Sequence, residues 1–293
     1  MDKNTRQIIK KGNQLMAESS ICFCSIIRNG NSALIKNIKK LEVLRSKFKN
    51  SQVVVFENDS TDGTKDTLAK WSNEYENVLA ICQNFKTNTI PTSEINGFNK
   101  YFSNQRISKM ADYRNQYLKV LADLKSHYDY IMIVDLDIED FSIDGVAHSF
   151  GLAEHWDVIT ANGYSYSPSL KKRYHDTYAL TEIGTENMVQ TEEVISNNQK
   201  KWSFLNLGMP LIPVYSAYGG LAIYKGNVLK NKTYEALQNN DARVEVKCEH
   251  FSLHHQIQQE NRKIFINPNM TVLYQKVSLT LMKKYIGEKL NLF

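Results

Sequence analysis

The chain has no hydrophobic run long enough to cross a membrane, and it contains few cysteines. A membrane-spanning helix needs about 20 consecutive apolar residues, and the polar N-terminus has no apolar core of the kind found in secretory signal peptides. The four cysteines show no zinc-binding spacing, and Cys22 and Cys24 would share one face of a strand as buried thiols. We therefore expect a protein of a reducing compartment, cytoplasmic or peripheral at the inner face of a membrane.

Strong basic character is also absent. The net charge of +5 is a mild excess, far from the clustered lysines and arginines of a nucleic-acid-binding protein. It suits anionic substrates or an anionic membrane surface, so no nucleic-acid partner is expected. A hydrophobic content of 42% in 293 residues is ordinary for a soluble globular protein with one large core.

Apolar runs alternate with amphipathic stretches through the first half of the chain. The predicted strands are 21–27, 53–56, 78–82 and 130–134, and the predicted helices are 32–48, a short helix after Thr64, and 106–124. This alternation is typical of right-handed βαβ units. It predicts an α/β fold with a mainly parallel, Rossmann-like sheet flanked by helices.

The second half is less regular. It has candidate strands at 157–160, 221–224 and 264–268 and a helix at 248–259. The polar, tyrosine-rich segment 161–216 is too long for a simple connection, and such segments tend to be functional. The first 19 residues form a polar lead-in with weak helical periodicity. Residues 276–293 mix lysines with apolar residues, which suits either an interface with anionic lipids or packing on the domain.

Two acids follow the buried strand 130–134. Asp135 and Asp137 stand two residues apart, so their carboxylates would project from the same side of the chain at the strand end. Two like charges this close repel each other unless a cation lies between them. A hard divalent ion that also binds substrate phosphates would satisfy this pair. The other interpretation is an acidic turn that caps the next helix.

Another polar loop follows the strand 53–56. It runs from Glu57 to Thr64 with three acids and three hydroxyl residues, directly before a predicted helix. Carboxylates at such a strand end can bind a ribose or the N–H groups of a base. Ser, Thr and Asp are also the preferred helix-capping residues, so part of the loop has a structural role.

Together these motifs resemble the GT-A glycosyltransferases. The loop 57–64 is similar to the family's D-D-x-S-x-D-G-T nucleotide loop, and residues 135–137 are similar to its D-x-D metal motif. Segments 106–115, 174–180, 218–220 and 248–254 resemble elements of bacterial and fungal capsule-type members. One departure is that Glu57 and Asn58 occupy the positions of the first two acids, which shifts the nucleotide contact to Asp59.

The resemblance implies a nucleotide site. Arg28, Glu57 and Asp59 would hold the nucleotide. Arg106 and Arg114 lie two turns apart on one predicted helix face and would reach a phosphate or ribose. For each arginine the alternative is a solvated salt bridge.

The resemblance also implies a metal site for Mn²⁺ or Mg²⁺. Asp137 would bind the ion directly, and Asp135 would contact the ribose, or the ion through water. His250 and His254, four residues apart on one helical face, have a spacing that suits further ligands. A pair of surface histidines is the alternative.

Two acids are the candidates for catalysis. Glu249, at the start of a predicted helix, would deprotonate an acceptor hydroxyl if the transfer inverts the anomeric centre. A first-turn acid that interacts with the helix dipole is the alternative. Asp176 lies between Tyr174 and Tyr178 and would line the acceptor pocket, unless this loop simply packs on the sheet.

The function that the resemblance implies is metal-dependent transfer of a sugar from a UDP- or GDP-sugar to a polysaccharide or glycolipid, in capsule or lipopolysaccharide synthesis. Residues 20–140 would bind the nucleotide sugar, 141–275 would bind the acceptor and carry out catalysis, and 276–293 would form a C-terminal amphipathic helix with possible peripheral membrane contact.

Two other functions share this architecture. A sugar-phosphate nucleotidyltransferase would carry a glycine-rich basic loop after the first strand, whereas residues 28–31 read Arg-Asn-Gly-Asn. A non-catalytic sugar-binding module of the same fold would not need both strand-end acids.

Overall fold

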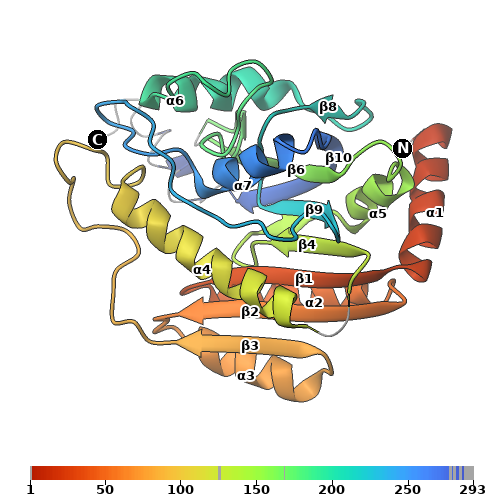
Figure 1. The fold of residues 1–293 in the computed structure, drawn as a ribbon. Coiled ribbons are helices and arrows are strands. Elements are labelled where there is room, and N and C mark those ends of the chain that lie inside the picture. The colour runs from red at the N-terminus through yellow and green to blue at the C-terminus, as the bar shows by residue number, and fades with distance from the viewer. Residues whose placement is uncertain are drawn as a thin grey trace.

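One mixed sheet organises the part of the chain that the structure describes (Figure 1). The structure is a computed structural model and describes residues 2–124, 127–167, 169–276, 279, 282, 283 and 286. Within these residues the sheet has ten strands, in the order β3-β2-β1-β4-β9-β6-β10-β5, with β7 paired to β6 and β8 to β10. The strands are β1 (Ser20–Ile27), β2 (Asn50–Asn58), β3 (Val78–Gln83), β4 (Tyr130–Val134), β5 (Asp140–Phe141), β6 (Val158–Tyr166), β7 (Lys172–Tyr174), β8 (Ile212–Pro213), β9 (Leu221–Lys225) and β10 (Ile264–Gln275).

Helices cover both faces of this sheet. They are α1 (Lys3–Glu18), α2 (Asn31–Arg45), α3 (Thr64–Glu74), α4 (Asn104–Asp123), α5 (Ile143–Gly151), α6 (Glu192–Lys201), the 3₁₀ helix η1 (Trp202–Phe204) and α7 (Glu249–Gln258). Side chains alternate along β1: Cys22 and Cys24 enter the core beneath α4 and α7, and Ile21 and Phe23 enter the core on the side of α2 and α3. None of the helices among the described residues is both long and apolar enough to cross a membrane.

The first half of the sheet confirms the predicted parallel α/β arrangement. Strands β3, β2, β1 and β4 lie side by side and run parallel. In the second half β9 runs antiparallel to β4 and to β6, and β10 runs parallel to β6. The carboxyl ends of β1, β2, β4, β6 and β10 therefore meet at one edge of the sheet, together with the start of β9.

Several elements differ from the sequence-based expectation. The expected lead-in is the 16-residue helix α1, which packs against α5 and is capped by the Asp2 side chain bonded to the backbone N–H of Thr5. The segment 161–216 contains the end of β6 and all of β7, α6, η1 and β8. The amphipathic helix predicted for residues 276–293 lies almost entirely outside the described residues.

Candidate active site

A pocket of about 360 Å³ opens at the edge where these strands end. Most of the predicted site residues line it: Arg28, Arg106, Arg114, Asp135, Asp137, Asp176, Glu249 and His250. They arrive from β1, α4, the turn after β4, the loop after β7 and the start of α7. Glu57, Asp59 and His254 do not line the pocket.

Asp135 is fixed by two tyrosines that the sequence analysis did not assign to the site. Tyr218, just before β9, donates a hydrogen bond to Oδ1 at 2.8 Å, and Tyr274, on β10, donates one to Oδ2 at 2.6 Å. Burial raises the pKa of the Asp135 carboxyl, and the nearby Arg114 guanidinium opposes that rise. Both oxygens are thus oriented by the protein, which suits a supporting ligand or a contact through water.

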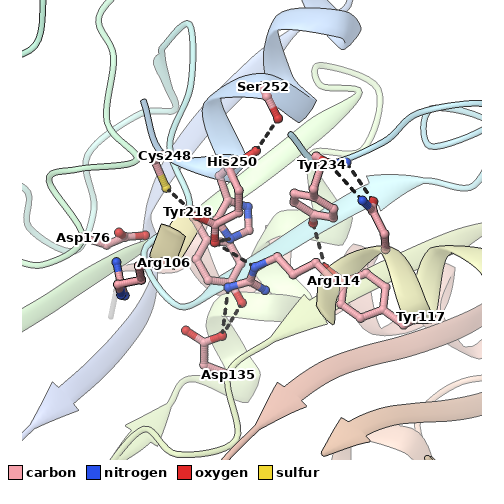
Figure 2. Close-up of polar contacts among 12 residues, drawn as sticks. Arg106, Arg114, Tyr117, Asp135, Asp176, Tyr218, Tyr234, Cys248, His250 and Ser252 are labelled. Atoms are coloured by element: carbon pink, nitrogen blue, oxygen red, sulfur yellow. Dashed lines mark hydrogen bonds and ion pairs between the residues drawn. The ribbon is translucent and has the colours of Figure 1, made fainter. Parts of the chain in front are cut away.

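Arg114 connects Asp135 with Glu249. Figure 2 shows the guanidinium of Arg114 above Asp135. Its Nε lies 3.0 Å from Oε1 of Glu249, and its Nη2 lies 3.8 Å from Oδ1 of Asp135. Arg114 and Glu249 are each 4% exposed, and the guanidinium lies over the ring of Tyr218. The second oxygen of Glu249 accepts a bond from the Cys248 thiol at 3.4 Å. Arg114 therefore forms a buried salt bridge, not the solvated one that the sequence analysis gave as its alternative role.

Asp137 stands at the exposed mouth of the pocket. Desolvation by the surrounding protein, followed by repulsion from Asp135, raises the pKa of its carboxyl to about 6. Among the described residues no side chain donates a hydrogen bond to this carboxylate, so its oxygens are available to a ligand. A bound cation would relieve the cost of ionising it.

The described residues contain no group of three or more His, Cys, Asp or Glu side chains arranged to hold a metal ion. Magnesium-type sites in enzymes commonly use only one or two carboxylates, with substrate phosphates and water completing the shell. Asp137 and Asp135 fit that mode, because both supply hard oxygen ligands at the pocket and because no side chain in the described part of the chain donates a hydrogen bond to Asp137.

The two histidines of α7 have different environments. His254 is fully buried, and both ring nitrogens are engaged, with Ser216 Oγ at 3.0 Å and Tyr224 OH at 2.9 Å. The metal-ligand role predicted for His254 does not fit this arrangement. His250 stacks on Tyr218 with ring centroids 3.8 Å apart, and neither of its buried nitrogens has a hydrogen-bond partner among the residues that the structure describes. Burial, with help from the Arg114 charge, lowers the pKa of His250, so it lines the pocket as a neutral ring.

Asp176 faces the pocket from the loop after β7. Its backbone is left-handed, with φ of 64°, and its Oδ2 accepts a bond from the Gly219 N–H at 3.1 Å. Desolvation, reinforced by the charge of Asp135, raises the pKa of this carboxyl to about 7. Asp176 can therefore exchange a proton near neutral pH.

The acids of the 57–64 loop hold a segment beside the pocket without lining the pocket themselves. Oε1 of the fully buried Glu57 accepts a bond from the Ser60 N–H at 2.7 Å. Asp59, with φ of 53°, accepts a bond from the Lys86 N–H at 2.8 Å. Arg28 holds the same 86–89 segment through the carbonyl oxygen of Thr87 at 3.0 Å. In this structure these residues shape the loop beside the pocket.

The two tyrosines that bind Asp135 differ in how far the sequence marks them. Tyr218 precedes Gly219 and Gly220, both of which have positive φ, and this Tyr-Gly-Gly segment was noted only for its resemblance. Tyr274 lies in an ordinary strand pattern 139 residues from Asp135, and no local signal marks it.

Comparison with known proteins gives one family match. The family model described as Cryptococcal mannosyltransferase 1 matches residues 20–256. No curated protein sequence matches the chain.

Solved structures of similar shape share little sequence with the chain. The mannosyltransferase PcManGT from Pyrobaculum calidifontis, in complex with GDP-Man and Mn²⁺, is 12% identical with a TM-score of 0.46, covering 92% of this chain and 64% of that one. TarS from S. aureus is 15% identical with a TM-score of 0.48, covering 92% and 38%. GalNAc-T7 with UDP, GalNAc and Mn²⁺ is 11% identical with a TM-score of 0.47, covering 92% and 48%. The chain thus spans less than two thirds of the length of each.

Proposed function

The chain belongs to the Cryptococcal mannosyltransferase 1 family, and from this premise we propose that it is a GT-A-type glycosyltransferase that moves a sugar from a nucleotide sugar to a glycan or glycolipid. The observation that carries the proposal is the acid pair at the pocket: Asp135 is oriented by two tyrosines, and Asp137 is open to a ligand. The family description makes mannose the first sugar to test, with GDP and UDP as the candidate carriers. The proposed setting is the synthesis of a surface polysaccharide.

The pocket offers a place for each part of such a donor. Asp137, supported by Asp135, would hold a divalent cation, Mn²⁺ or Mg²⁺, which when bound neutralises charge on a diphosphate leaving group. Arg28 and the loop that it braces would border the nucleotide. Arg106 lines the same pocket, and its buried Nε has no hydrogen-bond partner within the described ranges. It would bond to a phosphate or ribose oxygen.

The two predicted catalytic acids would have different roles. Glu249 is ion-paired with Arg114 and fixes the arginine between two acids. Asp176 has a raised pKa of about 7 and one hydrogen bond from the backbone. In an inverting transfer Asp176 would be a better base than Glu249 for the attacking hydroxyl of the acceptor, since a base works best with a pKa near the working pH. The neutral ring of His250 would donate to or accept from a sugar hydroxyl beside it.

Calorimetry with GDP, UDP and their sugars, with and without Mn²⁺, tests the binding step. We expect either the guanosine or the uridine compounds to bind, and only when Mn²⁺ is present. In Asp137→Asn, Mn²⁺ should no longer promote this binding. Asp144→Asn is a matched control, because Asp144 is an exposed acid on α5 outside the pocket. Release of nucleoside diphosphate with a glycan acceptor tests transfer.

The alternatives predict different results in the same experiments. A nucleotidyltransferase would consume a nucleoside triphosphate and a sugar phosphate. A sugar-binding module would bind the nucleotide sugar and release no diphosphate. Either result, or the absence of any nucleotide binding, would overturn the proposal.

A further inference from the structure

An exposed apolar patch lies near the active-site edge of the sheet. It consists of Tyr166, Leu170, Phe204 and Leu207, whose exposed fractions are 42%, 56%, 48% and 71%. Single exposed apolar residues are common on protein surfaces, but a group of large ones marks an interaction site more often than chance. We call these four residues the apolar patch.

A side-chain contact joins the two segments that carry the apolar patch. Tyr166 ends β6 and pairs with Lys172 of β7, and Leu170 lies in the turn between these strands. The Lys172 ammonium donates a hydrogen bond to the carbonyl oxygen of Leu205, which lies between Phe204 and Leu207 in the sequence. The hairpin and the segment after η1 are therefore neighbours.

Basic residues flank the members of the apolar patch in the sequence. Lys171, Arg173 and Lys200 are exposed, Lys172 is half-buried, and Lys201 is paired with Glu182 at 2.5 Å. No acid occurs in residues 166–173 or 198–207. Apolar side chains with a rim of lysine and arginine match the two layers of a membrane interface, where acyl chains lie beneath anionic headgroups.

We propose that the apolar patch docks the protein on a membrane surface that contains anionic lipids. Charge favours this partner over two others. A second copy docked patch to patch would place the same cations opposite each other, which is unfavourable. The chain's own residues 277–293 carry Lys283, Lys284 and Lys289 against the single acid Glu288, so they would also be repelled.

The location of the patch adds a consequence for the pocket. The β6–β7 hairpin leads directly into His175 and Asp176, and the His175 ring stacks on Tyr274 with centroids 3.5 Å apart. A membrane contact at the hairpin would hold the pocket beside the lipid headgroups. This extension, which rests on the proposed function, makes a lipid-linked sugar the favoured acceptor.

Co-sedimentation of the full chain with vesicles tests the proposal without any substrate. We expect binding to phosphatidylcholine vesicles that contain phosphatidylglycerol and little binding to phosphatidylcholine alone. The triple variant Leu170→Ser, Phe204→Ser, Leu207→Ser should bind at least about tenfold more weakly, equivalent to about 1.4 kcal/mol. The matched control is Ile35→Ser, Val43→Ser, which removes two exposed apolar residues of α2 with exposed fractions of 47% and 55%. It should bind like the natural chain.

A second set of variants separates charge from apolar contact. Lys171→Glu, Arg173→Glu should lower binding to the anionic vesicles by about 30-fold or more, because each cation near such a surface contributes about fivefold. Lys39→Glu on α2 is the charge control, and Lys283→Glu, Lys289→Glu tests the C-terminal residues. Both should retain binding.

Four results would overturn the proposal. One is failure of the intact chain to bind anionic vesicles at any salt concentration. Another is binding of the triple variant, shown to be folded by circular dichroism, that equals binding of the natural chain. Binding that only Lys283→Glu, Lys289→Glu removes would assign the contact to the C-terminal residues. Sedimentation velocity should show the same oligomeric state for the natural chain and the triple variant. Dissociation of a dimer by these substitutions would make the patch a self-association surface instead.

Discussion

Arg114 and Glu249 form a buried ion pair with Nε and Oε1 3.0 Å apart, although 135 residues separate them in the sequence. The pair joins α4, from the first half of the chain, to α7, from the second. The same guanidinium lies 3.8 Å from Asp135. An ion pair in the candidate site thus joins the two halves that the sequence analysis distinguished, residues 20–140 and 141–275.

Replacing Arg114 should destabilise the protein strongly. Arg114→Met would leave Glu249 and Asp135 buried beside each other without a cation, and breaking a buried pair in this way typically costs about 3–5 kcal/mol. Urea denaturation measures the loss. Arg243→Met is the control, because Arg243 pairs with Glu94 at 2.5 Å on the surface and should matter little. If both substitutions lower the free energy of unfolding equally, the buried pair contributes no more to stability than the surface pair.

Neutralising Asp137 should stabilise the metal-free protein and abolish its response to metal. The raised pKa of about 6 means that ionised Asp137 is unfavourable in the folded state without a cation. Asp137→Asn should therefore melt at a higher temperature than the natural chain at pH 8 in a chelator. Saturating Mn²⁺ should raise the melting temperature of the natural chain only, since a ligand at 100 times its Kd adds about 2.7 kcal/mol. An equal metal response in both proteins would place the ion elsewhere.

Asp176 should make stability depend on pH between about pH 4 and 7. Its pKa rises from the ordinary value of 3.8 to about 7 on folding, so the folded state binds the proton more tightly. As pH rises through this window, the unfolded chain loses the proton first, and folding becomes less favourable by at most about 1.4 kcal/mol per pH unit. Asp176→Asn should flatten that slope in urea titrations at several pH values. An unchanged slope would show that Asp176 already ionises near its ordinary pKa.

Asp59→Ala should weaken nucleotide binding through the loop that Asp59 supports. Loss of its bond to the Lys86 N–H would free the 86–89 segment that Arg28 also holds. We expect a loss of about 1–3 kcal/mol in calorimetry, the usual effect of removing such a partner. Asp59→Asn keeps an acceptor oxygen and should lose less. If both variants bind the nucleotide normally, the loop acids act only in local structure.

The sequence predicted the edge of the site better than its interior. The apolar runs of β1, β2 and β4 predict where each strand ends. Because parallel strands end at the same edge, this places Arg28, Asp135 and Asp137 at one edge of the sheet. The partners of these acids depend on distant pairing. Periodicity in β10 does not indicate that Tyr274 reaches Asp135, and the four-residue spacing of His250 and His254 does not indicate which neighbours each ring meets.

Helix α5 shows why local propensity failed elsewhere. The sequence analysis assigned no helix to residues 143–151, and Gly145 and Gly151 lower the intrinsic helix propensity of this segment. Both glycines allow close backbone contacts: a Cβ on Gly145 would lie 2.3 Å from the carbonyl oxygen of Asn269, and one on Gly151 would lie 2.1 Å from that of Ile8. Packing between distant segments outweighs propensity at these positions.

The place of β10 in the sheet has a consequence for biosynthesis. This strand pairs with β6 and carries Tyr274, yet α6, β9 and α7 are all translated between β6 and β10. While the ribosome makes those elements, one side of β6 has no neighbour, and an open strand edge invites pairing with other chains. The nascent protein therefore passes through an interval in which it is both inactive and prone to aggregate, and its yield should respond to chaperone supply and to translation speed between β6 and β10.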